Sequence, residues 1–206
     1  FSEHGIEKAY LVGFRIGDLY VTHNKSSVTI KSNTTQLAQV NLMKSLFSQY
    51  GPIWVSSPQS RKNVYHCTVT LNHSFQFLMK KPSTIPLWIS RSSHAFWAFI
   101  AGYTDAEGTI RIYSSRARLR VGSYDKMILK QIHLWLIKNG IKNSFRLESP
   151  ADFVHRNGDF YRVDIMDRYA LYTTLQHLIP LLRHERRKKD AIEALLNVTR
   201  RIKHLI

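Results

Sequence analysis

Apolar and polar residues alternate along several short segments of this chain, and longer segments between them repeat apolar residues at helical spacing. Alternation predicts strands, because successive side chains of a strand point to opposite faces. Helical spacing predicts helices with one buried face, as in 125–139, which is followed by Gly140. In chain order the predicted elements are helix, two strands, helix, two strands and helix, and this order occurs twice. The sequence therefore predicts an α+β protein with an internal repeat.

The predicted strands place their polar residues on one face. Thr109, Arg111 and Tyr113 alternate with Ile110 and Ile112, and the other strands follow the same pattern. We therefore expect each half to form an antiparallel sheet with helices on one side and a polar, arginine-rich face on the other.

The repeat also predicts the domain organisation. Residues 1–81 and 93–206 form the two halves, and 82–92 is the linker, with two prolines and four serines or threonines. The segment after Pro180 has no counterpart in the first half, so we expect an added C-terminal helix. The basic run Arg183–Lys189 lies at the start of this helix. It is interpreted either as a solvated helix face or as a contact for phosphate.

The charge balance indicates a polyanionic partner. The 206 residues include 30 Lys and Arg against 14 Asp and Glu, a formal net charge of +16. Such an excess is typical of proteins that bind nucleic acid. The single cysteine, Cys67, excludes a disulfide framework and a CxxC zinc site.

The apolar segments are all too short to span a membrane, and no signal peptide is recognised. We therefore expect a soluble, intracellular protein, in the cytoplasm of a prokaryote or in an organelle. The four tryptophans are interpreted as core residues; they are Trp54, Trp88, Trp97 and Trp135.

Two segments, 10–18 and 99–107, share a pattern in which one small residue lies four positions before another and a carboxylate follows at once. Residues at i and i+4 share one face of a helix, so each segment offers a stripe where a second helix can approach closely. If the stripes pack together, Asp18 and Glu107 lie side by side at the C-terminal ends of their helices. Both the mutual repulsion and the helix dipoles disfavour two anions there, which favours a divalent cation at this point. The small residues are Gly13, Gly17, Gly102 and Ala106.

These segments, Leu11–Leu19 (LVGFRIGDL) and Ile100–Gly108 (IAGYTDAEG), resemble the paired motifs of the LAGLIDADG homing endonucleases in their monomeric, two-repeat, intron-encoded form. The resemblance extends over about residues 6–180. It implies two pseudo-symmetric αββαββα half-domains with saddle-shaped sheets facing DNA and the motif helices at the central interface. The implied activity is a metal-dependent double-strand break in a long, asymmetric DNA site, leaving short 3′ overhangs.

The resemblance also implies the residues of the active site. Asp18 and Glu107 are expected to be the catalytic, metal-binding acids, with the backbone carbonyls of Gly17 and Ala106 as further ligands. Asp105 is expected to have a local structural role. Oxygen ligands suit Mg²⁺; Mn²⁺ is expected to substitute, and Ca²⁺ to bind without supporting cleavage. The auxiliary active-site candidates are Lys31, Ser32, Ser123 and Arg111.

The polar sheet faces are expected to bind double-stranded DNA, since arginine can donate two hydrogen bonds to guanine and strands can enter a major groove. The proposed contacts are Tyr20, Thr22, Thr29, Lys31, His66, Thr68, Arg111, Tyr113, Arg116, Arg118, Arg120, Arg146 and Arg162.

Two alternatives use the same scaffold. One is a maturase that binds intron RNA and assists splicing, and the other is a DNA-binding regulator that does not cleave. Either would need the basic faces but not both acids, so the retention of Asp18 and Glu107 favours cleavage.

Overall fold

The computed structural model describes residues 5–24, 26–56, 63–152 and 158–203. The first half contains α1 (Gly5–Gly17), β1 (Tyr20–Asn24), β2 (Ser27–Thr34), α2 (Leu37–Phe47), β3 (Ile53–Ser56), β4 (Tyr65–Asn72) and the 3-10 helix η1 (His73–Leu78). The second half contains α4 (Ser93–Glu107), β5 (Gly108–Tyr113), β6 (Arg116–Ser123), α5 (Lys126–Lys138), β7 (Ser144–Ser149), β8 (Phe160–Ile165) and α6 (Arg168–Leu178). A short helix, α3 (Leu87–Ser90), lies in the predicted linker, and α7 (Glu185–Lys203) follows the second half.

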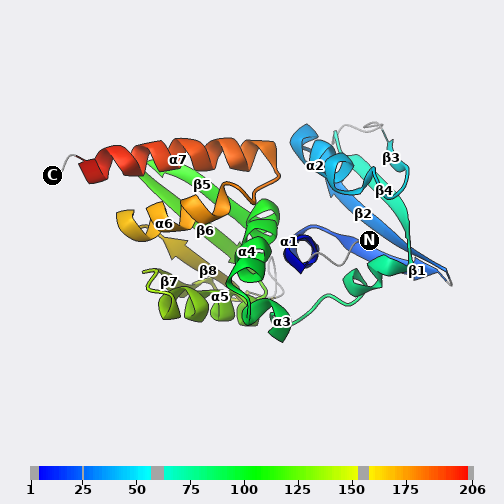
Figure 1. Ribbon diagram of the computed structural model, residues 1–206, viewed down its shortest axis with the longest axis horizontal. Helices are drawn as coiled ribbons and strands as arrows, with labels where there is room; N and C mark the ends of the chain where they lie inside the picture. Colours follow the sequence, from blue (N-terminus) through cyan, green and yellow to red (C-terminus); the bar gives the residue numbers. More distant parts are fainter. Residues whose placement is uncertain (1–4, 25, 57–62, 153–157, 204–206) are drawn as a thin grey trace.

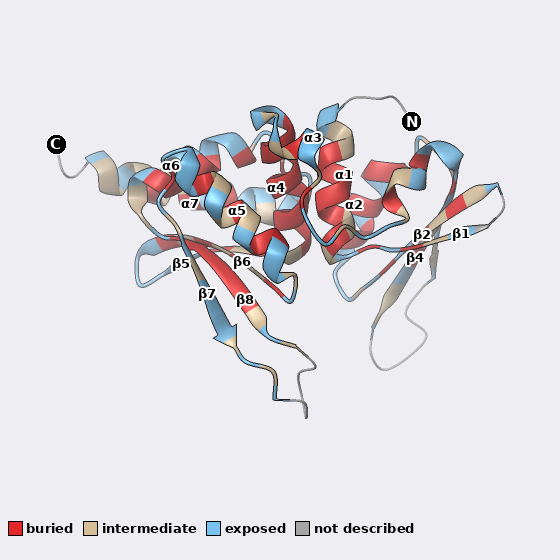
Figure 2. Ribbon diagram, turned by 90° about the horizontal axis from the view of Figure 1, so that it is seen from below, coloured by how far each residue is buried: buried red, intermediate tan, exposed pale blue. Residues whose placement is uncertain are grey.

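The two halves have the same sheet topology. The strand order is β1-β2-β4-β3 in one four-stranded sheet and β5-β6-β8-β7 in the other, with antiparallel neighbours throughout. The helices cover one side of both sheets, and the strands diverge from the centre on the other side (Figures 1 and 2). The predicted α+β class and internal repeat are confirmed.

Helices α1 and α4 pack side by side at the centre of the molecule (Figure 1). A Cβ atom on Gly13 would overlap the Phe99 carbonyl oxygen and lie 2.9 Å from Tyr103 N. A Cβ atom on Gly102 would overlap the Tyr10 carbonyl oxygen. Backbone therefore touches backbone at both glycines, as the stripes of small residues predict.

The strands bury their apolar residues against the helices and leave the opposite face open. Val28, Ile30 and Cys67 are fully buried, for example. The interpretation of the tryptophans as core residues is confirmed for Trp97, which is buried, and for Trp135, which packs against the core. It was wrong for Trp54, which is 73% exposed, and for Trp88, which is 41% exposed. Trp54 lies between Ile53 and Val55 on a strand at the edge of the sheet, and strand alternation places it on the polar face.

Helix α7 lies along α6, β5 and β6 (Figure 1). Asn197 fixes it to the β5–β6 turn, because its Oδ1 accepts from Ala117 N at 3.1 Å and its Nδ2 donates to the Ser115 carbonyl at 3.2 Å. Within the described ranges, none of the helices combines the length and the apolar character needed to cross a bilayer.

Candidate functional site

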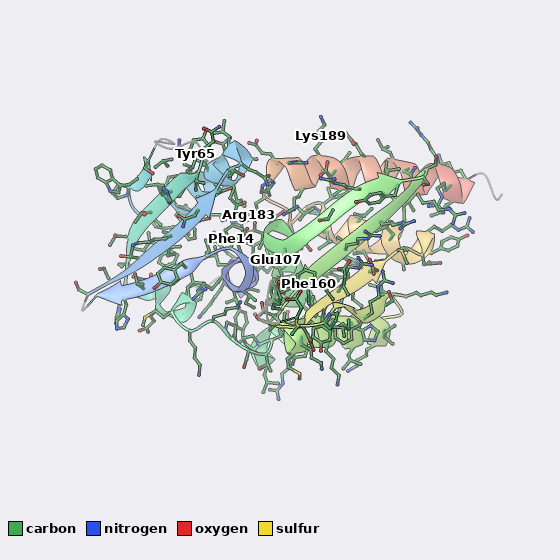
Figure 3. All side chains as sticks on the ribbon, turned by 180° about the vertical axis from the view of Figure 1, so that it is seen from behind. Phe14, Tyr65, Glu107, Phe160, Arg183 and Lys189 are labelled. Atoms are coloured by element: carbon green, nitrogen blue, oxygen red, sulfur yellow. The ribbon has the colours of Figure 1, made fainter. Side chains whose placement is uncertain are left out.

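The two motif acids meet at the C-terminal ends of α1 and α4. Asp18 directly follows α1, and Glu107 is the last residue of α4. A Cβ atom on Gly17 would lie 2.9 Å from Glu107 Cγ and 3.2 Å from Glu107 Oε1. The Glu107 carboxylate therefore lies against the residue that precedes Asp18, and Figure 3 shows Glu107 near the junction of the two halves. We call Asp18 and Glu107 the acid pair.

The surroundings of the acid pair oppose its ionisation. Burial first, then the negative charges of Asp18 and Asp125, raises the pKa of half-buried Glu107 to about 7. Asp18 is an exposed residue, but the protein atoms around its carboxyl group desolvate it and thereby raise its pKa to about 6. Two carboxyl groups with raised pKa values at two helix C-termini form a site that a cation would stabilise.

Gln39 is a neighbour of Asp18 that sequence reasoning missed. This side chain of α2 is buried, and its Nε2 donates to Asp18 Oδ2 at 3.0 Å. The hydrogen bond lowers the pKa of Asp18 and fixes the orientation of its carboxylate. The available signal was an amide on an otherwise apolar helix face, since Gln39 lies at helical spacing from Leu42, Met43 and Leu46.

Arg187 is a second neighbour that sequence reasoning missed. It lies in the first turn of α7, with Nε donating to the Asp105 carbonyl at 3.0 Å and Nη2 donating to the Ala106 carbonyl at 3.1 Å. Its positive charge lowers the pKa of both Asp18 and Glu107. The Ala106 carbonyl, expected as a metal ligand, thus already accepts one hydrogen bond, and its ligand role stays a prediction.

On the other side of the site, Lys81 and Asp125 are near Glu107. Lys81 Nζ lies 3.1 Å from Asp125 Oδ2, and the two residues shift the pKa of Glu107 in opposite directions. Ser123, an auxiliary candidate, donates to Asp125 Oδ2 at 3.0 Å. The structure therefore connects Ser123 to the site through Asp125.

The other auxiliary candidates lie on two strands, Lys31 and Ser32 on β2 and Arg111 on β5. Ser32 is 3% exposed and faces the helix layer, away from the polar face, so it contributes to the core rather than to a DNA contact. Lys31 and Arg111 are exposed on their strands.

The first sheet exposes a mixed aromatic and polar face. Tyr20 pairs with Lys31, Lys31 with Thr68, and Thr68 with Trp54, so these four residues form one row across the sheet. Tyr20, at one end of this row, is 64% exposed, and Trp54, at the other end, is 73% exposed. The predicted contacts Thr22, Thr29 and His66 lie on the same face, half-buried or exposed.

The second sheet is richer in arginine, but carboxylates engage part of that charge. Asp164 is 1% exposed and lies 3.2 Å from Arg120 Nε, 3.5 Å from Arg146 Nε and 2.8 Å from Arg162 Nε. Arg162 is 8% exposed and also pairs with Glu148. Its proposed DNA contact therefore competes with two carboxylates. The other predicted contacts on this face, all exposed or half-buried, are Arg111, Tyr113, Arg116 and Arg118.

The donor set of the acid pair fits a hard divalent cation. In the described part of the chain, no three or more His, Cys, Asp or Glu side chains gather at one point. Two carboxylates leave most coordination positions to water and phosphate oxygens, which is how proteins commonly bind Mg²⁺.

Comparisons with known proteins agree with this arrangement. Residues 97–178 match the family of LAGLIDADG-like domains. I-DmoI in complex with DNA and Ca has a TM-score of 0.63 at 22% identity, over 92% of this chain and 97% of I-DmoI. I-WcaI bound to its DNA recognition sequence has a TM-score of 0.61 at 13% identity, over 90% and 85%.

A third similar structure is the N-terminal LAGLIDADG domain of DUF199/WhiA, with a TM-score of 0.59 at 14% identity, over 86% of this chain and 84% of that domain. No curated protein matches the sequence. The chain thus has the fold of the LAGLIDADG homing endonucleases, with two repeats in one polypeptide. Residues 97–178 form its LAGLIDADG-like domain, and the resemblance seen in the two motifs is confirmed.

Proposed function

We propose that this protein is a site-specific homing endonuclease that makes double-strand breaks in a long, asymmetric DNA target. The observation that supports this proposal most directly is the acid pair, with Glu107 against Gly17, at the junction of two polar sheet faces. An acid pair with raised pKa values has no stabilising role of its own. It is accounted for if Asp18 and Glu107 hold a divalent cation beside DNA.

Mg²⁺ is the proposed cofactor, with Mn²⁺ able to substitute and Ca²⁺ able to bind without supporting cleavage. Structures of I-DmoI have been determined with DNA and Ca and with DNA and Mn, and a substituted variant of I-DmoI has been determined with its target DNA in the presence of Mg. When bound, such a cation lowers the pKa of a water molecule and stabilises charge on a phosphodiester. Asp18 and Glu107 would hold it, with Gly17 and Ala106 carbonyls as further ligands.

Two other residues of the site would orient the acid pair and balance its negative charge. Gln39 fixes the Asp18 carboxylate, and Arg187 offsets negative charge at the acid pair. The sheets would supply most of the DNA affinity. The first sheet presents the mixed row that includes Tyr20 and Trp54, whereas the second presents the arginines around Asp164. Because the two faces differ in chemistry, each half would bind a different DNA sequence, as an asymmetric target requires.

The proposed organisation is a monomer with half-domains 1–81 and 93–206 and the linker 82–92. Intron RNA maturation and non-cleaving regulation need no acid pair, and I-DmoI and I-WcaI were both determined with DNA. Incubating the protein and Mg²⁺ with a randomised duplex library, then sequencing the ends, tests the proposal. We expect one long recurring target cut in both strands with short 3′ extensions. Products cut in one strand only, or at unrelated sequences, would contradict it.

A further inference from the structure

A polar cavity of about 220 Å³ lies where the first half meets α7, next to the pocket that contains Glu107. Its walls come from the start of α2, from β5 and from the first turns of α7, and α7 contacts both of the other elements (Figure 1). We call it the junction cavity. The side chains that define its chemistry are Arg111, Arg186, Arg187, Gln36, Thr109 and Asp190.

The junction cavity has a positive charge balance. Three guanidinium groups line it against the single carboxylate of Asp190. Arg111 and Arg186 are exposed, and within the described residues no carboxylate forms an ion pair with either of them. A guanidinium group matches phosphate geometry through two parallel hydrogen bonds.

Arg187 is held in place before any ligand arrives. Two of its nitrogen atoms donate to the consecutive carbonyls of Asp105 and Ala106. The segment that leads into α7 is fixed as well, because Asp105 Oδ2 accepts from the backbone N–H groups of Arg183 and His184. Little side-chain entropy remains to be lost at Arg187 when an anion binds.

The start of α2 adds positive potential from the other half. This helix has 11 residues, and Gln36 at its N-terminus provides no side-chain cap. Uncapped N–H groups and the helix dipole favour an anion at this end. Thr109, on the wall from β5, lines both the junction cavity and the pocket that contains Glu107, so the two spaces share a wall.

We propose that the junction cavity binds a backbone phosphate of the DNA duplex next to the cleaved bond, with Arg187 as the fixed group and Arg111 and Arg186 closing over it. This inference rests on the proposed function for its ligand. It also gives α7, which the internal repeat does not include, a role in bringing the two halves onto one DNA strand.

The test compares two double variants with equal loss of charge. Arg111→Gln with Arg186→Gln changes the junction cavity, whereas Arg200→Gln with Lys203→Gln changes two exposed residues in the last turn of the same helix. Affinity for a mixed-sequence duplex of roughly 30 bp, about three helical turns, is measured from about 50 to 200 mM salt with Ca²⁺ present. Thermal unfolding verifies that both variants are folded.

We expect the cavity variant to make the slope of log affinity against log salt shallower by about 0.9, the value for one lost phosphate contact. The control variant should keep the wild-type slope. Equal slopes for the two variants would show that only net charge matters and would overturn the inference. A third double variant, Arg111→Lys with Arg186→Lys, keeps both positive charges. It should keep most of the wild-type slope of log affinity against log salt.

The proposed function can fail separately. If the wild-type protein cuts no duplex in the randomised library but the two slopes differ, the cavity binds phosphate in a protein that is not an endonuclease. If the library is cut and the slopes coincide, the protein is an endonuclease and the junction cavity is not its phosphate site.

Discussion

Tyr10 Oη donates a 2.6 Å hydrogen bond to Asp105 Oδ2 and thereby joins the two central helices. Burial, followed by the Asp105 charge, raises the pKa of Tyr10, so the phenol stays a donor at neutral pH. The same oxygen accepts from Arg183 N at 2.8 Å and His184 N at 3.1 Å. One carboxylate oxygen therefore connects α1, α4 and the entry to α7, and the position of Arg187 depends on it.

Asp105→Ala should destabilise the protein by about 2–3 kcal/mol, because it leaves the buried N–H of His184 and the Tyr10 hydroxyl without an acceptor. Urea unfolding measures this effect. Tyr10→Phe removes one donor only and should cost about 1 kcal/mol. An unchanged unfolding midpoint for Asp105→Ala would disprove the structural role of this residue.

Gly102→Ala should destabilise the protein by about 3 kcal/mol or more, since the added methyl group overlaps the Tyr10 carbonyl oxygen and separates α1 from α4. The matched control is Gly5→Ala in α1, where a Cβ atom meets no atom within 4 Å. That variant should be neutral or slightly stabilised. Thermal unfolding distinguishes the two, and similar unfolding temperatures would contradict the close packing of the helices.

The raised pKa of Glu107 predicts a pH-dependent effect of Glu107→Gln on stability in the absence of metal. The folded-state pKa is about 7, against about 4.3 for an unfolded chain. The folded protein therefore binds more protons in this window and loses stability as pH rises through it. Glutamine removes that loss, so the variant should unfold at a higher temperature than wild type at pH 8. The difference should disappear near pH 4; a variant less stable than wild type at pH 8 would be inconsistent with this electrostatic account.

Gln39→Ala should slow DNA cleavage by about 10–100-fold, the usual effect of removing a group that orients a metal ligand. The variant loses the hydrogen bond to Asp18 but no group on the sheet faces. Single-turnover cleavage and duplex binding are measured in parallel. Affinity for DNA with Ca²⁺ should stay within about twofold, whereas an unchanged cleavage rate would remove Gln39 from the site.

Much of the fold could be predicted from the sequence because its signals are local or repeated. Strand alternation predicted the strand at 109–113, which the structure gives as β5 (Gly108–Tyr113). Gly140 adopts the positive φ of 74° expected after a helix, and the glycine stripes predicted the contact of α1 with α4. Trp54 was misassigned because hydrophobicity alone does not show which side of an edge strand it occupies.

The acid pair was predictable for the same reason, since each copy of the motif contributes one of its two acids. Arg187 was not, because its partners Asp105 and Ala106 are about 80 residues earlier and only the docking of α7 brings them together. Asp105 was expected to have a local role, but its partners Arg183 and His184 are equally distant in sequence. The ion pairs of Asp164 with Arg120 and Arg146 likewise depend on the pairing of β8 with β6 and β7. The ion pair of Arg162 with Asp164 is different, because the two residues are two positions apart on one face of β8, where strand alternation already places them together.

The most direct test of the central claim is to compare wild-type protein with Asp18→Asn and Glu107→Gln on the duplex recovered from the randomised library. With Mg²⁺, the wild type should cut both strands at one sequence, and neither variant should cut. With Ca²⁺, each variant should bind that duplex as tightly as the wild type does. Cleavage at the wild-type rate by either variant would show that the acid pair is not the metal centre.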